Sequence, residues 1–367
     1  MGGHEQQAAA PRAQTLDATL ERLTRSSVPG LSVVVLDARG AYESAAGVAD
    51  LDSRRPATLD TVYLWFSMTK IATATAVMQL VEQNRLALED PVRKHLPEFP
   101  APRRAWPEVR VRNLLNHSAG LANPVPVRWV HPAAEPGRDP RAFTLELLAR
   151  HGRLRYPAGS RASYSNLGYI ALGEVISAAA GMRYEDYVRA SILAPLGMTS
   201  TDFGYRDDMA SAAATGYQPR LSPSTPLFRM LLPKGIVGPN RGRYLSFRRF
   251  CVDGAAYGGL VGSARDASRF MSAHLGGGRL DGVRMLSAES VAEMQTIGAH
   301  GRKLDVGLGW FRRRSDPESA ERYLEHLGGG GGFFNMMRIY PDRGVGVLAM
   351  GNSTKYDHTA VAAAATS

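Results

Sequence analysis

The chain has 367 residues, of which 44% are hydrophobic and 21% charged, and these proportions exclude a disordered or fibrous protein. Its net charge of +10 is concentrated in residues 209–252, which hold seven basic residues and no acid. No nucleic-acid-binding motif accompanies them, so we expect a solvated loop and no nucleic-acid partner. Cys251 is the only cysteine, which excludes an intrachain disulfide and thiol-ligated zinc.

Residues 1–15 are polar and rich in alanine, without the apolar core of a secretory signal, and we expect them to be disordered. No apolar stretch is long enough to span a bilayer. Both observations favour a cytoplasmic protein.

The first elements are a short helix and a hairpin. Leu16–Leu23 has amphipathic spacing. Leu31–Leu36 and Ala41–Val48 read as strands around the turn 37–40. From Ser67 to about Arg85 the apolar residues recur at helical spacing.

The rest of the chain is helical in the middle and extended at the end. Helices are predicted over Ala142–His151, Leu167–Ala180 and Tyr184–Ile192, and strands over Val306–Arg312, Phe333–Tyr340 and Val345–Gly351. The sequence thus predicts an α+β fold in which an antiparallel sheet from both termini is flanked by helices. The sheet domain comprises residues 16–70 and 255–367, and a mostly helical domain, residues 71–254, is inserted in it, with the active site between the two.

Ser67-Met68-Thr69-Lys70 is the first candidate catalytic motif. A spacing of three places Ser67 and Lys70 on one helical face. An amine with a lowered pKa can take the proton of a serine hydroxyl, and a helix N-terminus favours negative charge on its oxygen.

Two further motifs carry groups suited to acyl transfer. Tyr164-Ser165-Asn166 offers a phenol that can move a proton and an amide that can orient substrate, although Asn166 could equally be the N-cap of the next helix. His326-Leu327-Gly328-Gly329 opens a glycine-rich stretch whose backbone N–H groups can approach a substrate closely, or which forms a flexible turn.

In this order, the three motifs resemble the β-lactamase-related serine hydrolase family, which includes class C β-lactamases and penicillin-binding-protein-like enzymes. Residues 114–121, 194–198 and 258–263 resemble it too. The resemblance implies that Ser67 is the acylated nucleophile and that Lys70 and Tyr164 share the general acid and base roles. The N–H groups of Ser67 and Gly329 would form the oxyanion hole, and Asn166, His326 and Gly328 would line the site. No cofactor is implied.

The third motif departs from the Lys-Thr-Gly of class C β-lactamases, since His326-Leu327-Gly328 lacks both the cation and the hydroxyl. It looks most like family VIII carboxylesterases, and a small-molecule ester or amide is the expected partner. A D,D-carboxypeptidase, a D-aminopeptidase, a weak β-lactamase, an acyltransferase and a non-turnover penicillin-binding sensor are the alternatives. Trp129, Tyr257 and Pro223–Leu232 are candidates for shaping the acyl pocket. The sequence predicts no oligomeric state.

No other hydrolase motif competes with this interpretation. The chain has no Gly-x-Ser-x-Gly pentapeptide of an α/β-hydrolase and no His-Glu-x-x-His zinc motif.

Overall fold

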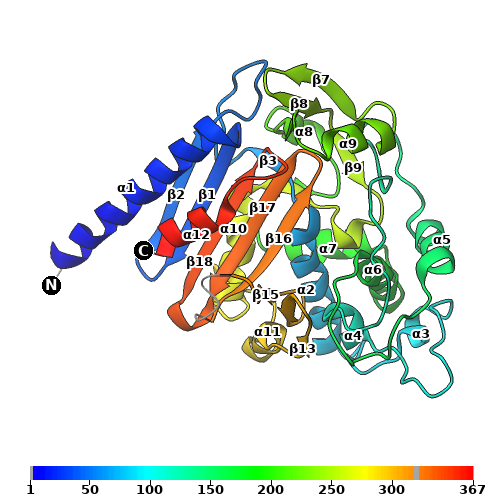
Figure 1. Ribbon diagram of the computed structural model, residues 1–367. Coiled ribbons are helices and arrows are strands. Elements are labelled where there is room, and N and C mark those ends of the chain that lie inside the picture. Colours follow the sequence, from blue (N-terminus) through cyan, green and yellow to red (C-terminus); the bar gives the residue numbers. More distant parts are fainter. Residues whose placement is uncertain (1–2, 317–321, 367) are drawn as a thin grey trace.

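The computed structural model describes residues 3–316 and 322–366 (Figure 1). Its largest sheet has eight strands in the order β13-β14-β15-β16-β17-β18-β1-β2. Strand β1 from the N-terminal part pairs antiparallel with β18 from the C-terminal part, so the predicted antiparallel sheet built from both ends is confirmed. The strands of this sheet are β1 (Gly30–Asp37), β2 (Gly40–Gly47), β13 (Ala299–His300), β14 (Leu304–Val306), β15 (Phe311–Arg313), β16 (Leu324–Gly330), β17 (Phe333–Tyr340) and β18 (Val345–Gly351).

Helices cover both faces of this sheet because its strands alternate their buried side chains. Val33 and Val35 of β1 join one apolar cluster, whereas Val34 between them joins another. The first cluster includes residues of α1 (Gly3–Ser26) and α12 (His358–Thr366), which lie across the same face in Figure 1. The second cluster includes residues of α10 (Ala264–Leu275) and α2 (Thr69–Glu82). The core is therefore divided into two layers by the sheet.

Helices and small sheets make up the middle of the chain. The helices are α3 (Val92–His95), α4 (Val111–Leu115), α5 (Pro140–His151), α6 (Asn166–Ala180), α7 (Tyr184–Val188), α8 (Asp207–Ala210), α9 (Thr225–Leu231) and, later in the chain, α11 (Ala288–Gln295). The small sheets pair β10 (Val261–Ser263) with β3 (Val62–Leu64) and β5 (Thr201–Asp202), β4 (Val130–Pro132) with β9 (Phe250–Val252), β11 (Arg279–Leu280) with β12 (Val283–Arg284), and β8 (Tyr244–Phe247) with β6 (Gly216–Pro219) and β7 (Val237–Arg241). The division into a sheet domain and an inserted helical domain stays a prediction.

Three local expectations were wrong. The N-terminal stretch is not disordered from residue 3 onward, because α1 begins at Gly3, and its alanines and glutamines have high helix propensity. The basic stretch 209–252 is not an open loop, since it forms α9 and a three-stranded sheet. The predicted strand Val306–Arg312 is split into β14 and β15 by a turn at Gly309, whose φ of +80° ends the extended backbone.

None of the described helices combines the length and hydropathy needed to cross a bilayer.

Candidate active site

Ser67 lies in a single turn of 3₁₀ helix, Phe66–Met68, that leads directly into α2. Phe66 before it has a φ of +48°, which is uncommon for a residue with a side chain. Its ring packs against the backbone of Gly330, where a Cβ would lie 2.3 Å from the ring. Tertiary packing thus holds the half-buried Ser67 in a tight turn beside β16.

Lys70 is fully buried one turn after Ser67, as the spacing predicted. Its Nζ lies 3.0 Å from Ser67 Oγ, 2.9 Å from Asn166 Oδ1 and 2.7 Å from the carbonyl oxygen of Tyr257. Burial lowers the pKa of Lys70 well below its usual value. A neutral amine has two N–H donors and one lone pair. Donation to Asn166 and Tyr257 therefore leaves the lone pair for the Ser67 hydroxyl.

Tyr164 lies beside the Lys70 amine, two residues before α6 begins at Asn166. The centre of its ring is 5.0 Å from Lys70 Nζ. Burial raises the pKa of the Tyr164 phenol, and a hydrogen bond with Ser67 opposes part of that rise. The phenol is therefore protonated at neutral pH and lies within reach of the serine.

The start of α6 holds Asn166 in place. Ser165, not Asn166, is the N-cap of this helix, because its Oγ accepts a hydrogen bond from Gly168 N. The Asn166 side chain therefore does not cap the helix and accepts a hydrogen bond from Lys70 Nζ instead. The backbone N–H of Asn166 donates to Asn123 Oδ1 at 3.0 Å.

His117 supports Tyr164, a contact that the sequence did not predict. Its ring centre lies 4.4 Å from that of Tyr164, and its Nδ1 accepts a hydrogen bond from Ser165 N at 3.2 Å. Burial lowers the pKa of His117 well below its usual value, and the positive charge that Lys70 carries in its protonated form is a further cause. His117 lies in the stretch 114–121, which resembles the family, but no pattern in the sequence indicated that its ring would contact Tyr164.

The third motif lies on β16, whose edge faces the turn that carries Ser67. β16 pairs with β17 along its length, and its pairing with β15 is given at Phe311↔Glu325. Among the described strands, none therefore lies beside the edge from residue 326 onward on that side. A Cβ at Gly328 would lie 1.9 Å from the carbonyl oxygen of Trp65, so only glycine allows this approach. Gly329, the next residue, is exposed.

His326 is buried next to Tyr164, with 6.1 Å between the ring centres. Its Nδ1 lies 2.9 Å from the carbonyl oxygen of Leu327 and donates to it, since a carbonyl can only accept. Burial, and then the positive charge that Lys70 carries in its protonated form, lower the pKa of His326 to about 3, and the Leu327 hydrogen bond has a weaker opposing effect. This histidine is uncharged at neutral pH.

The structure therefore gathers Ser67, Lys70, Tyr164 and Asn166, and it places His326 and Gly328 at their border. The Tyr257 carbonyl is a contact of Lys70 that the sequence missed, since a backbone oxygen gives no sequence signal. Trp129 packs edge-on against the Tyr257 ring at 5.7 Å, close to this group. Pro223–Leu232 contains α9, where Phe228 packs on Phe247 of β8, and its part in an acyl pocket stays a prediction. Within the described ranges no group of three His, Cys, Asp or Glu side chains could hold a metal ion.

The fold is that of β-lactamases and penicillin-binding proteins. A D-amino acid amidase from Ochrobactrum anthropi SV3 superposes with a TM-score of 0.78 at 22% identity, over 97% of this chain and 99% of that one. EstCE1, described as a hydrolase with promiscuous acyltransferase activity, superposes with a TM-score of 0.73 at 22% identity, over 98% of this chain and 99% of that one.

The family model described as Beta-lactamase matches residues 14–366, so the chain belongs to the Beta-lactamase family, whose members are serine hydrolases. Penicillin-binding protein 4* of Bacillus subtilis is 28% identical over 334 residues, 88% of this chain and 68% of that protein. Protein Rv1367c of Mycobacterium tuberculosis is 32% identical over 271 residues, 68% of this chain and 63% of that protein. The chain thus spans about two thirds of the length of these relatives.

Proposed function

We propose that this chain hydrolyses small carboxylic esters through an acyl-enzyme on Ser67. The observation that carries the proposal is the buried Lys70 amine, 3.0 Å from Ser67 Oγ, whose two N–H groups have fixed carbonyl acceptors. Its lone pair is the proton acceptor that a serine hydroxyl needs to become a nucleophile.

The reaction follows from these groups. Lys70 takes the Ser67 proton as Oγ bonds to the acyl carbon, and the N–H groups of Ser67 and Gly329 stabilise the resulting oxyanion. Tyr164 is protonated and lies beside Lys70, so it gives a proton to the departing alcohol and recovers one from the lysine. Water then attacks the acyl carbon by the same route, which releases the acid and restores Ser67.

The uncharged state of His326 favours substrates that have no carboxylate. A neutral, buried histidine supplies no cation for a substrate carboxylate, and Leu327 adds no hydroxyl donor. Substrates that end in a carboxylate, such as β-lactams and D,D-peptides, therefore lose an ion pair at this position. Uncharged esters form no ion pair at this position, so the absence of a cation does not weaken their binding. Amides of D-amino acids are the second candidate, because such a substrate also has no carboxylate that would need a cation at this position.

The test compares wild type with Ser67→Ala on p-nitrophenyl acetate, butyrate and octanoate, with nitrocefin and D-phenylalanine amide alongside. We expect ester turnover that falls at least about a thousandfold in Ser67→Ala, and little turnover of nitrocefin. Equal turnover in Ser67→Ala would contradict the role of Ser67. A stoichiometric burst that then stops would favour a penicillin-binding sensor, or an acyltransferase that lacks its acceptor.

A further inference from the structure

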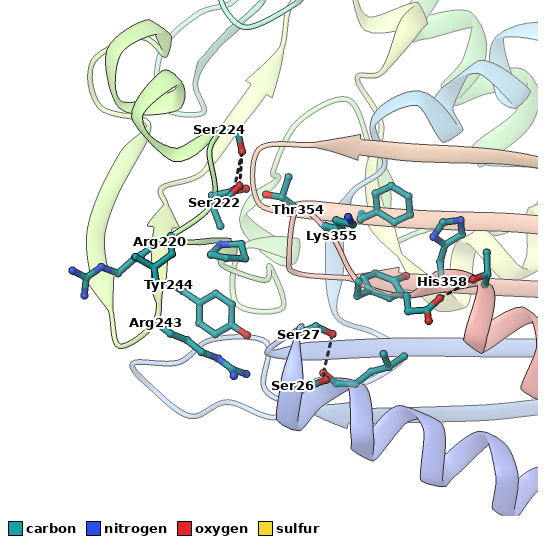
Figure 2. Close-up of a pocket in the computed structure, with 18 of the residues that line it drawn as sticks. Ser26, Ser27, Arg220, Ser222, Ser224, Arg243, Tyr244, Thr354, Lys355 and His358 are labelled. Carbon is teal, nitrogen blue, oxygen red and sulfur yellow. Dashed lines mark hydrogen bonds between the residues drawn. The ribbon is translucent and has the colours of Figure 1, made fainter. Parts of the chain in front are cut away.

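A second site lies at the end of the sheet, away from Ser67. It is a cavity of about 1370 Å³ between the C-terminal end of α1, the strands β6 and β8, and the segment that joins β18 to α12. Figure 2 shows Arg220, Arg243 and Tyr244 on one side of it and Thr354, Lys355 and His358 on the other. None of the residues that line it belongs to the Ser67 group.

The wall of this cavity holds polar atoms without partners. The hydroxyls of Tyr244 and Tyr356 and the Oε1 of Gln218 are buried, and in the part of the chain that the structure describes they have no hydrogen-bond partner. The three residues are 5%, 4% and 2% exposed. His358 Nε2 lines the same cavity and is also unpartnered among the described residues. A buried polar atom without a partner costs free energy, and the two tyrosine hydroxyls can donate, so they indicate a ligand group that accepts hydrogen bonds.

The rim of the cavity is cationic. Arg22 and Lys355 are exposed and form no ion pair with any described residue, and Arg220 and Arg243 donate only to backbone carbonyls. Asp357 is the one acid among the lining residues, and its carboxylate already accepts from Thr359 Oγ1 and Ala360 N. Four cations therefore surround the cavity, and Asp357, which interacts with the charge of Arg22, is the single carboxylate among the described lining residues. An oxyanion is the group that such a rim attracts.

The remaining lining is apolar. Leu23, Phe334 and the Tyr356 ring contribute to the floor, and Leu221 is fully exposed at the margin. A fully exposed leucine beside a large cavity marks a surface that gains from covering by an apolar ligand. The cavity thus combines an apolar floor, unpartnered hydroxyls and a cationic rim.

We propose that this cavity binds an amphiphilic anion, with a carboxylate or phosphate head at the cationic rim and an apolar chain on the Leu23 and Phe334 floor. The head replaces the missing acceptor for the hydroxyls of Tyr244 and Tyr356, and the chain covers Leu221. The site is independent of the ester chemistry at Ser67.

The experiment is isothermal titration of the full chain with dodecanoate and with dodecyl phosphate, each below its micelle concentration. Dodecanol and dodecyltrimethylammonium are the neutral and cationic comparisons. We expect micromolar binding of at least one anion and at least tenfold weaker binding of the other two compounds. The preferred anion tells whether the head is a carboxylate or a phosphate.

Two double variants locate the binding. Arg22→Gln/Lys355→Gln should weaken the anion at least tenfold, whereas Arg85→Gln/Lys303→Gln, which removes the same charge from exposed residues elsewhere, should leave it unchanged. Both variants should hydrolyse p-nitrophenyl acetate like wild type, which separates this cavity from the Ser67 site.

Several results would overturn the proposal: no binding of either anion, equal binding of dodecanol, or full affinity in the rim variant. A dimer that Leu221→Glu dissociates, together with no anion binding, would show that a second copy covers the cavity instead.

Discussion

At the scale of single residues, the state of Lys70 decides what the candidate site can do. Its side chain is surrounded by the rings of Tyr164, Tyr169 and Tyr257, each centred within 5.4 Å of Nζ, and no carboxylate forms an ion pair with it among the described residues. Without a counter-ion, burial favours the neutral amine. Replacing the Asn166 amide by a carboxylate would place a negative charge beside Nζ and would favour the protonated form of Lys70.

Asn166→Asp should move the acid limb of the pH–rate profile upward. The neutral amine exists above the pKa of Lys70, so wild-type ester turnover falls as the pH drops through that value. A carboxylate 2.9 Å from Nζ favours the ammonium form and raises the pKa of Lys70. Turnover at pH 7 should then fall at least tenfold and recover in part at higher pH.

The measurement is kcat/KM for p-nitrophenyl acetate between pH 5 and 10. Asn240→Asp on β7 adds the same charge at an exposed position and serves as the control. An unshifted acid limb in Asn166→Asp would show that Lys70 is not the titrating base.

At the scale of elements, the site depends on how closely β16 approaches the turn before α2. This contact is backbone against backbone, since Gly328 lies against the carbonyl of Trp65. Asn335, paired with Gly328 across the β16–β17 ladder, donates its side-chain Nδ2 to the carbonyl of Leu64 at 2.9 Å. Two neighbouring strands are thus tied to the segment that carries Ser67.

Gly328→Ala should damage both stability and turnover. The added Cβ would lie 1.9 Å from the Trp65 oxygen, so β16 must move away, at a cost of about 1–3 kcal/mol in the free energy of unfolding. Urea denaturation and ester hydrolysis measure the two effects. Gly204→Ala is the matched control, because a Cβ there meets nothing within 4 Å. Wild-type behaviour of Gly328→Ala in both assays would contradict the close approach.

At the scale of the whole molecule, the sheet separates a supporting layer from the layer that carries the site. Helices α1 and α12 share the apolar cluster on one face, while α2 belongs to the cluster on the other. A change in the α1 layer should therefore alter the stability of the fold without altering the chemistry at Ser67.

Leu20→Ala tests this separation. Leu20 is 1% exposed in α1, and its truncation should lower the free energy of unfolding by about 2–5 kcal/mol. The kcat for p-nitrophenyl acetate at 20 °C should stay within twofold of wild type, provided that circular dichroism shows the variant to be folded. Glu21→Ala changes the exposed neighbour, which forms a surface ion pair with Arg25, and should cost less than about 1 kcal/mol. A large loss of kcat in folded Leu20→Ala would show that the layers are coupled.

Local patterns in the sequence were enough to predict the elements with regular spacing. Strands β17 and β18 have the predicted bounds, because their alternation and the turn between them are properties of adjacent residues. Ser67 and Lys70 meet because three residues span about one helical turn. The class of fold followed from the same patterns together with the family motifs.

The tertiary structure decided what depends on residues far apart in the chain. The carbonyl of Tyr257 meets Lys70 across 187 positions, and a backbone oxygen has no sequence signature. The lowered pKa values of Lys70 and His326 come mainly from burial, which only the packed chain creates. The second cavity joins the end of α1 to segments more than 190 residues later. Spacing along the chain determines which neighbours can meet, whereas solvent exclusion by distant segments determines their charge and chemistry.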